Sequence, residues 1–117
     1  MNILMILNDP PYGTERTYNA LRLALNLMQK AEGAGLTVFL MGDAASAGKA
    51  GQQTPNGYYN IERMLKGLLT RKGEVLLCGT CMDARAIRET ELVEGCRRST
   101  LDELTERTVS ADKVLVF

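Results

Sequence analysis

Short, continuous apolar runs recur along the chain and predict strands that are buried on both faces. They lie at residues 2–7, 36–41, 74–78 and 113–117, and none of them alternates with polar positions. Continuous runs of this length are typical of strands in a parallel sheet, where helices cover both faces. Residues 92–96 form a weaker candidate for a short extra strand.

Helical patterns separate these runs. Residues 15–32 place apolar side chains on one helical face, at Tyr18, Leu21, Leu25 and Met28, and Thr14 is the expected N-cap. A second amphipathic helix is predicted to enter from Asn60 and to end before Gly73. A third is predicted over residues 101–109, capped by Thr100 or Ser99. Strands that alternate with helices predict βαβ units and a three-layer α/β fold.

The chain of 117 residues has room for one domain, over residues 1–117. Its longest connection, residues 42–59, far exceeds the usual ~2 to 6 residues after a strand. Residues 44–50 could form a short helix there, and Tyr58 and Tyr59 are expected to anchor the loop or contact another subunit. We expect this loop to serve binding or assembly, with disorder as the alternative.

Composition removes several classes of function. The chain has no histidine, which excludes a Ser-His-Asp triad, a Cys-His dyad and zinc sites that use imidazole. The 14 basic side chains balance 14 acidic ones, so no long-range field favours nucleic acid or an anionic membrane. No apolar run approaches the roughly 20 residues that cross a bilayer. Three cysteines without an export signal favour the cytoplasm and free thiols.

The segment CGTC, residues 78–81, is the main candidate for chemistry. Cys78 ends a predicted strand at the sheet edge where α/β domains bind ligands, and a helix can start after it. Gly79 allows close approach of backbone, and Arg85 could add positive potential that favours a thiolate. Cys81 is either a resolving thiol or a small core residue.

Two further readings accompany the cysteine pair. Cys96 has no partner nearby in sequence and is expected to be structural. A metal site would need four ligands, which a chain with three cysteines and no histidine supplies poorly, so we expect no metal and no cofactor. The turn PYGT, with Tyr12, Gly13 and Thr14, could present backbone N–H groups to an anion, or be an ordinary turn.

Five segments together resemble the DsrE/DsrF-like family, in particular its YchN-like branch. They are PYGTE leading into NALRLAL, VFLMGDAASAGKAGQ, GYYNIERML, LCGTCMDARAI and SADKVLVF, which span almost the whole chain. The resemblance implies a three-layer α/β/α fold with a five-stranded, mostly parallel sheet and assembly into homo-oligomers, a hexamer or trimer. The sequence departs from relatives at Ala86, where they often have glycine.

The resemblance also implies a role in intracellular sulfur trafficking. Cys78 matches the cysteine that receives sulfane sulfur as a persulfide from a donor protein and passes it to an acceptor protein, while Cys81 matches a second cysteine of the YchN-like branch. Gly79 and Thr80 would offer backbone donors to a Cys78 thiolate. The alternatives are a dithiol redox protein that cycles a Cys78–Cys81 disulfide and an oligomeric binding protein without catalysis. Whether such a carrier is an enzyme stays open.

Overall fold

The computed structural model describes residues 1–55 and 59–117, so that the predicted loop anchor Tyr58 lies outside the described residues. Five parallel strands form one sheet in the order β4-β3-β2-β1-β5. Their bounds are β1 Asn2–Leu7, β2 Gly35–Leu40, β3 Glu74–Cys78, β4 Arg97–Ser99 and β5 Lys113–Val116. The strands β1, β2 and β3 lie in the middle, which explains their continuous apolar sequences.

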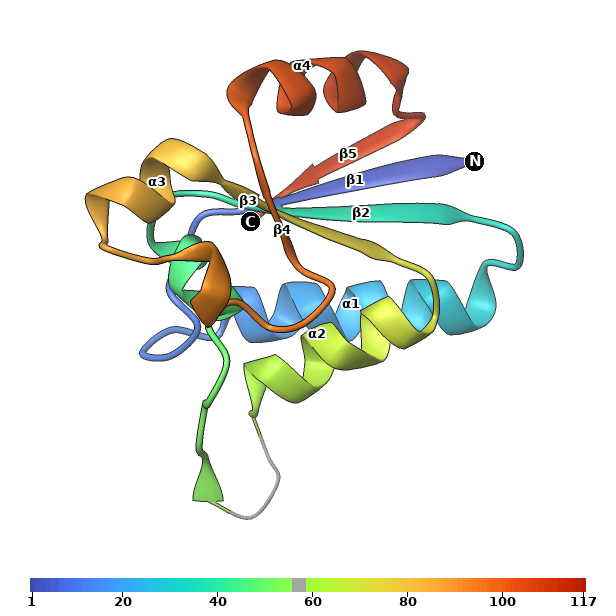
Figure 1. Ribbon diagram of the computed structural model, residues 1–117. Helices are drawn as coiled ribbons and strands as arrows, with labels where there is room; N and C mark the ends of the chain where they lie inside the picture. Colours follow the sequence, from blue (N-terminus) through green and yellow to red (C-terminus); the bar gives the residue numbers. More distant parts are fainter. Residues whose placement is uncertain (56–58) are drawn as a thin grey trace.

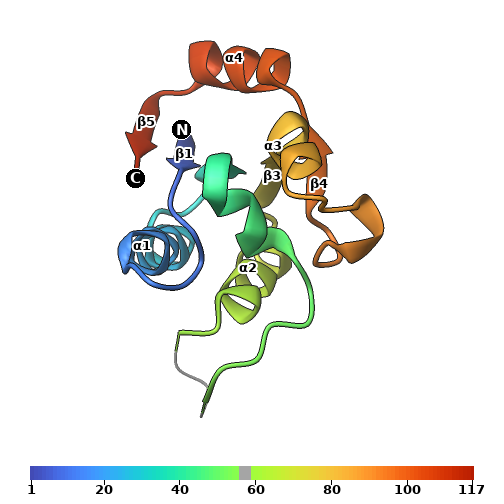
Figure 2. The same ribbon diagram turned by 90° about the vertical axis from the view of Figure 1, so that its left-hand side faces the viewer.

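Helices cover both faces of this sheet and give three layers (Figure 1). The helices α1 (Arg16–Lys30) and α2 (Ile61–Thr70) pack side by side on one face, and α4 (Leu101–Ser110) lies on the other. The short helix α3 (Gly79–Ala84) and the 3-10 helix η1 (Gly42–Gly48) gather at the carboxyl ends of the strands (Figure 2). A second 3-10 helix, η3, spans Glu89–Glu91. The structure confirms the predicted three-layer α/β fold.

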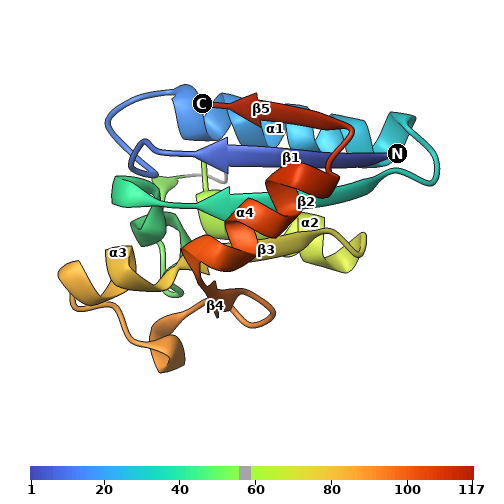
Figure 3. The ribbon, with the colours of Figure 1, turned by 90° about the horizontal axis from the view of Figure 1, so that it is seen from above.

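The two faces of the sheet carry cores of unequal size. The larger core lies under α1 and α2 and includes Met5, Val38 and Leu65, each of them fully buried. The smaller core lies under α4 and contains Leu4, Phe39, Leu76, Cys78 and Leu104. Seen from above, α4 crosses the sheet as one short helix (Figure 3). The smaller core is therefore covered by a single amphipathic helix that contributes only Leu104 as a buried side chain.

Most predicted elements are confirmed, with small shifts at their ends. The strand over residues 74–78 agrees with the prediction. The start of α2 agrees as well, because the Asn60 side chain caps the helix by accepting a hydrogen bond from the Arg63 N–H at 3.1 Å. The prediction that Thr14 caps α1 is wrong. That helix begins after Glu15 without a side-chain cap, and the Thr14 hydroxyl donates to Asp9 instead.

The extra strand predicted over residues 92–96 is also wrong. Leu92 makes only an isolated antiparallel bridge with Lys49, and the fifth strand of the sheet is β4, which pairs with β3. Its sequence, Arg97–Ser99, is polar because β4 is an edge strand with one side open to charged partners. A pattern based on apolar runs cannot find such a strand.

The carboxyl ends of the strands bring the candidate residues to one edge of the sheet. Cys78, the last residue of β3, pairs in register with Ser99 of β4, and β2 leads there directly into η1. Among the described residues, none of the helices combines the length and the apolar character needed to cross a membrane.

Candidate functional site

Cys78 stands at the junction between β3 and α3. Its backbone is extended, with φ −60° and ψ 117°, and it occupies the N-cap position of α3. Cys78 belongs to the smaller core beneath α4, and the residue is only 8% exposed. This position keeps the sulfur away from bulk water while the N–H groups of the first turn of α3 remain close to it.

Hydrogen bonds at Cys78 favour its ionised form. The Thr80 hydroxyl lies 3.2 Å from the Cys78 sulfur. Burial raises the pKa of the Cys78 thiol, but hydrogen bonds from the Thr80 hydroxyl, the Cys81 thiol and the backbone N–H groups of both residues outweigh burial and lower that pKa below its ordinary value. The site therefore holds a thiol that ionises more readily than a free cysteine.

Cys81 is the neighbouring thiol and behaves in the opposite way. Burial and its hydrogen bond with Cys78 raise the pKa of the Cys81 thiol above the ordinary value. The Gly42 N–H donates to the Cys81 sulfur at 3.2 Å, and this contact joins the loop after β2 to α3. Gly42 adopts φ +57°, a conformation that favours glycine. Of the two thiols, Cys78 is therefore the one that ionises first, and Cys81 is placed to donate a hydrogen bond to it.

Arg85 lies beside Cys81 rather than Cys78. Its guanidinium donates to the Cys81 carbonyl at 3.1 Å and pairs with Asp43 at 2.8 Å. It acts against the rise in the pKa of Cys81. From the sequence, the positive charge of Arg85 was expected to act on Cys78, but its contacts in the structure place it beside Cys81.

Arg98 of β4 is a basic residue that lies against Gly79, the residue after Cys78, and the sequence did not indicate it. Its guanidinium lies against Gly79, so closely that a Cβ on residue 79 would be 2.8 Å from the guanidinium carbon. Asp83 holds it through two hydrogen bonds of 2.8 and 2.9 Å. The negative charge of a Cys78 thiolate contributes to raising the pKa of Arg98, after the larger contribution of Asp83. Only the parallel pairing of β3 with β4 brings these residues together, and no local sequence signal shows it.

The turn with Tyr12, Gly13 and Thr14 serves another part of the same sheet edge. The Tyr12 hydroxyl donates to Gln52 at 2.6 Å and accepts from the Ile61 N–H at 3.2 Å, which links the turn to the start of α2. Gly13 adopts φ +99° with open space around it. In the described part of the chain, no hydrogen bond joins these three residues to either cysteine.

One buried carboxylate, which was not named from the sequence, forms hydrogen bonds with the loop after η1. Glu62 of α2 accepts hydrogen bonds from the N–H groups of Gly51 and Gln52, each at 2.9 Å, and pairs with Lys66 at 3.1 Å. Burial opposes ionisation, yet these contacts lower the pKa of Glu62 overall. The described part of the loop up to Gln52 is therefore an ordered piece of the fold.

Cys96 lies apart from the pair. It packs at the larger core, on the α1 and α2 side of the sheet, and burial together with the charge of Glu62 raises the pKa of its thiol to about 12. Across residues 1–55 and 59–117, no cluster of three or more histidine, cysteine or carboxylate side chains is placed to hold a metal ion. The structure brings together Cys78, Cys81, Gly79 and Thr80.

This arrangement can perform thiol chemistry. A sulfur that ionises readily sits three positions before a protonated thiol that can donate to it or attack a species bound to it. Arg98 offers positive charge at the site, held in place by Asp83. The three free cysteines leave the pair in its reduced form.

Comparison with known proteins places this chain in a family. The chain matches the DsrE/DsrF-like family over residues 1–117. It is 44% identical to protein YchN of Escherichia coli K12 over 98% of this chain and 97% of that protein, and 34% identical to the uncharacterized protein MK0008 of Methanopyrus kandleri over 98% of this chain and 93% of that protein.

Solved structures show the same fold. The crystal structure of the E. coli ychN protein superimposes with a TM-score of 0.95 at 44% identity and covers 100% of this chain and 99% of that chain. The protein of unknown function MTH1491 from Methanobacterium thermoautotrophicum shares the fold, with a TM-score of 0.76 at 14% identity over 99% of this chain and 97% of that chain. The chain therefore belongs to the DsrE/DsrF-like family, in its YchN-like branch.

Proposed function

We propose that the protein is a sulfur carrier that accepts sulfane sulfur on Cys78 as a persulfide and passes it on. The observation that carries this proposal is the different surroundings of the two thiols, because Thr80 and the start of α3 donate hydrogen bonds that lower the pKa of Cys78, while the pKa of Cys81 is raised. A carrier needs one nucleophilic sulfur and a second thiol that does not compete for the incoming sulfur. Membership of the DsrE/DsrF-like family supports a role of the sulfur-relay type.

The transfer balances without an added oxidant. The Cys78 thiolate attacks the outer sulfur of a donor persulfide, a new S–S bond forms at Cys78, and the S–S bond of the donor breaks to release the donor as a thiolate. In the second step the outer sulfur moves to an acceptor thiolate and Cys78 is restored as a thiolate. Cys81, after losing its proton to the leaving thiolate or to water, or a thiol of a partner protein takes the role of acceptor.

Neighbouring groups stabilise the charged species in both steps. The Thr80 hydroxyl and the N–H groups of Thr80 and Cys81 donate to the sulfur of Cys78. Arg98 lies over Gly79 and adds positive potential next to the thiolate. The 8% exposure of Cys78 restricts access to small sulfur species or to a donor sulfur that projects into the site. The free cysteines suit the reducing cytoplasm.

A homo-oligomer is part of the same proposal. Exposed apolar side chains gather on α4 and β5, with Val109 at 83%, Leu101 and Val116 at 65% and Val114 at 39% exposure. The strand β5 also forms an open edge of the sheet. We expect these residues to be covered by further copies of the chain, and light scattering coupled to size-exclusion chromatography measures the assembly.

Intact-protein mass spectrometry after loading with polysulfide tests the proposal. Wild type is expected to gain at least one sulfur atom that dithiothreitol removes, Cys81→Ser to gain it as well, and Cys78→Ser to gain none. Cys96→Ser is the matched control, because it removes a thiol away from the site, and it should load like wild type.

Two other results would contradict the carrier. Loss of two hydrogens in wild type, without added sulfur, would assign the pair to thiol-disulfide redox chemistry. Full assembly of every variant without any modification at either cysteine would leave an oligomeric binding protein.

A further inference from the structure

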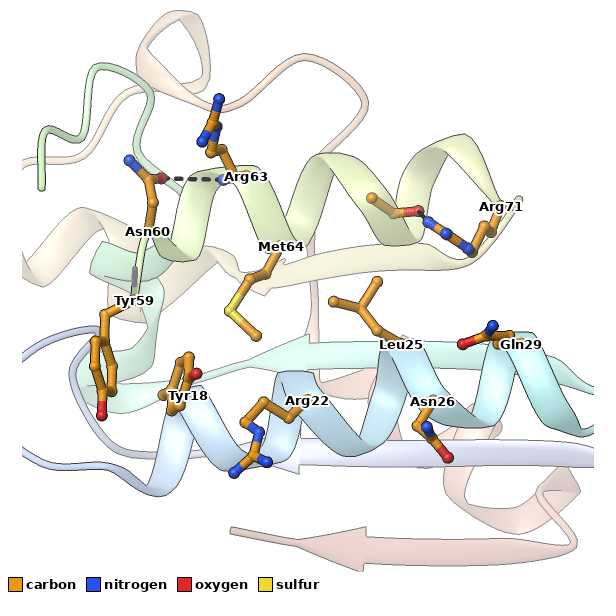
Figure 4. A pocket seen from close by; sticks show the side chains of 11 residues that line it. Tyr18, Arg22, Leu25, Asn26, Gln29, Tyr59, Asn60, Arg63, Met64 and Arg71 are labelled. Carbon is orange, nitrogen blue, oxygen red and sulfur yellow. Dashed lines mark hydrogen bonds between the residues drawn. The ribbon is translucent and has the colours of Figure 1, made fainter. Parts of the chain in front are cut away.

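A groove runs between α1 and α2 on the outside of that helix layer (Figure 4), and neither Cys78 nor Cys81 is among the residues that line it. Its volume is about 550 Å³, which lies in the range of pockets that bind small molecules and cofactors. Leu25 of α1 and Met64 of α2 point toward one another and form an apolar floor. Gly67 permits this close packing, because a Cβ there would lie 3.2 Å from the Leu25 side chain.

One end of the groove is aromatic. The rings of Tyr18 and Tyr59 lie with their centroids 4.2 Å apart at an angle of 39°, and the guanidinium carbon of Arg22 lies 5.7 Å from the centroid of Tyr18. Both faces of the Tyr18 ring are thus occupied. Tyr59 is 46% exposed, so that part of its ring remains open to a ligand in the groove.

Three arginines line the groove, and none of them has a carboxylate partner among the described residues. Arg22 donates to the Asn19 amide oxygen at 3.2 Å, and Arg71 donates to the Gly67 carbonyl at 3.2 Å, so that both of these partners are neutral. Arg63 is the third, on the rim of α2 opposite Arg22 (Figure 4). By contrast, most arginines outside the groove form an ion pair with a carboxylate, and Arg88 is the exception in the described part of the chain. The paired ones are Arg16, Arg85, Arg97, Arg98 and Arg107.

Among the residues that the structure describes, none that lines the groove has an acidic side chain. Its arginines therefore form a region of uncompensated positive charge on a chain whose formal net charge is zero. Guanidinium groups bind phosphate oxygens through paired N–H donors, which makes arginine suited to phosphate recognition.

The spacing of the arginines describes the shape of the ligand. Arg63 lies in the first turn of α2 and Arg71 is its C-cap residue, eight positions later, which is about 12 Å along the helix axis at 1.5 Å per residue. The tyrosines stand at the end where Arg22 and Arg63 lie, and Arg71 lies at the other end beside Gln29 (Figure 4). A ligand that uses all of these groups has a planar ring at one end and a chain of anionic groups that extends toward Arg71.

We propose that the groove between α1 and α2 binds a nucleotide that carries more than one phosphate. The base lies against Tyr59 and the apolar floor of Leu25 and Met64, and the phosphates extend from Arg22 and Arg63 to Arg71. The side-chain amides of Asn26 and Gln29 provide both hydrogen-bond donors and acceptors for polar edges of the ligand. The site is independent of the sulfur chemistry proposed for Cys78.

Isothermal titration calorimetry with ATP, AMP and inorganic tripolyphosphate tests this inference. ATP is expected to bind more tightly than either of the other two, because only ATP occupies both ends of the groove. Arg22→Gln and Arg63→Gln should each weaken ATP binding on the order of tenfold, since each removes a charged hydrogen-bond donor. Arg71→Gln should weaken ATP binding while AMP binding stays within about twofold, because AMP does not extend to Arg71.

Arg88→Gln is the matched control, because it removes the same charge from an exposed arginine outside the groove, and it should bind ATP like wild type. Amide chemical-shift changes on wild type give a second readout that needs no variant, and they should concentrate on α1 and α2. Several results would overturn the proposal: no heat of binding at millimolar ATP, unchanged binding in Arg22→Gln and Arg63→Gln, equal affinity for tripolyphosphate, or tighter binding of a single-stranded oligonucleotide or a polyglutamate peptide.

Discussion

The guanidinium of Arg98 lies against Gly79, and this contact places a positive charge from the edge strand β4 at the residue that follows Cys78. Asp83 fixes the guanidinium from the other side through two hydrogen bonds. The absence of a side chain at residue 79 is therefore a requirement of the site, since a Cβ would stand 2.8 Å from the guanidinium carbon.

Gly79→Ala is expected to displace Arg98 while the protein still folds, because the group in conflict is the far end of a flexible side chain. Loss of the nearby positive charge should raise the pKa of Cys78 and slow its alkylation by iodoacetamide severalfold at neutral pH. Arg98→Gln should reproduce this effect, and Arg97→Gln, on the same strand, should leave the alkylation rate unchanged. An unaltered rate in both Gly79→Ala and Arg98→Gln would exclude Arg98 from the site.

Thr80 gives a second way to alter the Cys78 thiolate. Thr80→Val removes the hydroxyl that lies 3.2 Å from the Cys78 sulfur but keeps the shape of the side chain. The pKa of Cys78 should rise, because one of the hydrogen bonds that oppose the effect of burial is lost. Thr80→Ser keeps the hydroxyl and serves as control. The rate of alkylation measured between pH 6 and pH 10 should shift to higher pH in Thr80→Val only.

Glu103 of α4 joins β4 to the helix layer above it and predicts a loss of stability in acid. Hydrogen bonds from Arg97 and Ser99 lower the pKa of the Glu103 carboxyl from 4.5 to about 2. Because the folded value is the lower one, the stabilisation is present above about pH 4.5 and disappears as the pH falls toward 2. Its size should be about 1 to 2 kcal/mol, since Arg97 is half exposed and the surrounding solvent screens its attraction to Glu103.

Urea unfolding of wild type and Glu103→Gln at several pH values measures this difference. The free energy of unfolding of the two proteins should converge as the pH falls from about 5 to 2.5, because the Glu103 contribution is then lost in wild type as well. A constant gap between them across this range would show that the Glu103 carboxylate is not selectively stabilised in the folded state.

Ala86 offers a stability test away from the sulfur chemistry. It follows α3 with φ +53°, in the left-handed region where a Cβ is unfavourable and where relatives were expected to carry glycine. Ala86→Gly should therefore stabilise the protein by roughly 0.5 to 1 kcal/mol. Ala84→Gly, at the last residue of α3 and also exposed, should instead destabilise it slightly, by up to about 0.5 kcal/mol. Thermal unfolding of the two variants distinguishes these signs.

The sequence predicted those parts of the fold that apolar spacing and local caps determine. The strand β3, its end at Cys78 and the Asn60 cap of α2 were all predicted, since each depends on residues adjacent in the chain. The polar edge strand β4 was missed, because hydrogen bonds to β3 and ion pairs stabilise it rather than an apolar sequence. Thr14 was predicted to cap α1 because it precedes the apolar helical pattern. Its actual partner, Asp9, lies five positions earlier in a turn, and the pattern of apolar residues gives no information about that turn.

The candidate site shows the same division. The adjacent residues Cys78, Gly79, Thr80 and Cys81 were named from one segment, and the structure brings them together at the start of α3. The contacts of Cys81 with Gly42 and of Gly79 with Arg98 join segments that are distant in sequence. Arg85 was expected to act on Cys78, but its length and its pairing with Asp43 direct it to Cys81. These features depend on the order of the strands in the sheet.

Tandem mass spectrometry at successive times after a pulse of isotope-labelled polysulfide most directly tests the claim that Cys78 receives the sulfur. Persulfides are alkylated, the protein is digested, and fragmentation of the peptide with both Cys78 and Cys81 locates the label. The account predicts that the label appears first on Cys78 and reaches Cys81 or an added acceptor thiol only later. Label that appears first on Cys81 or Cys96, or that loads equally in Cys78→Ser, would contradict it.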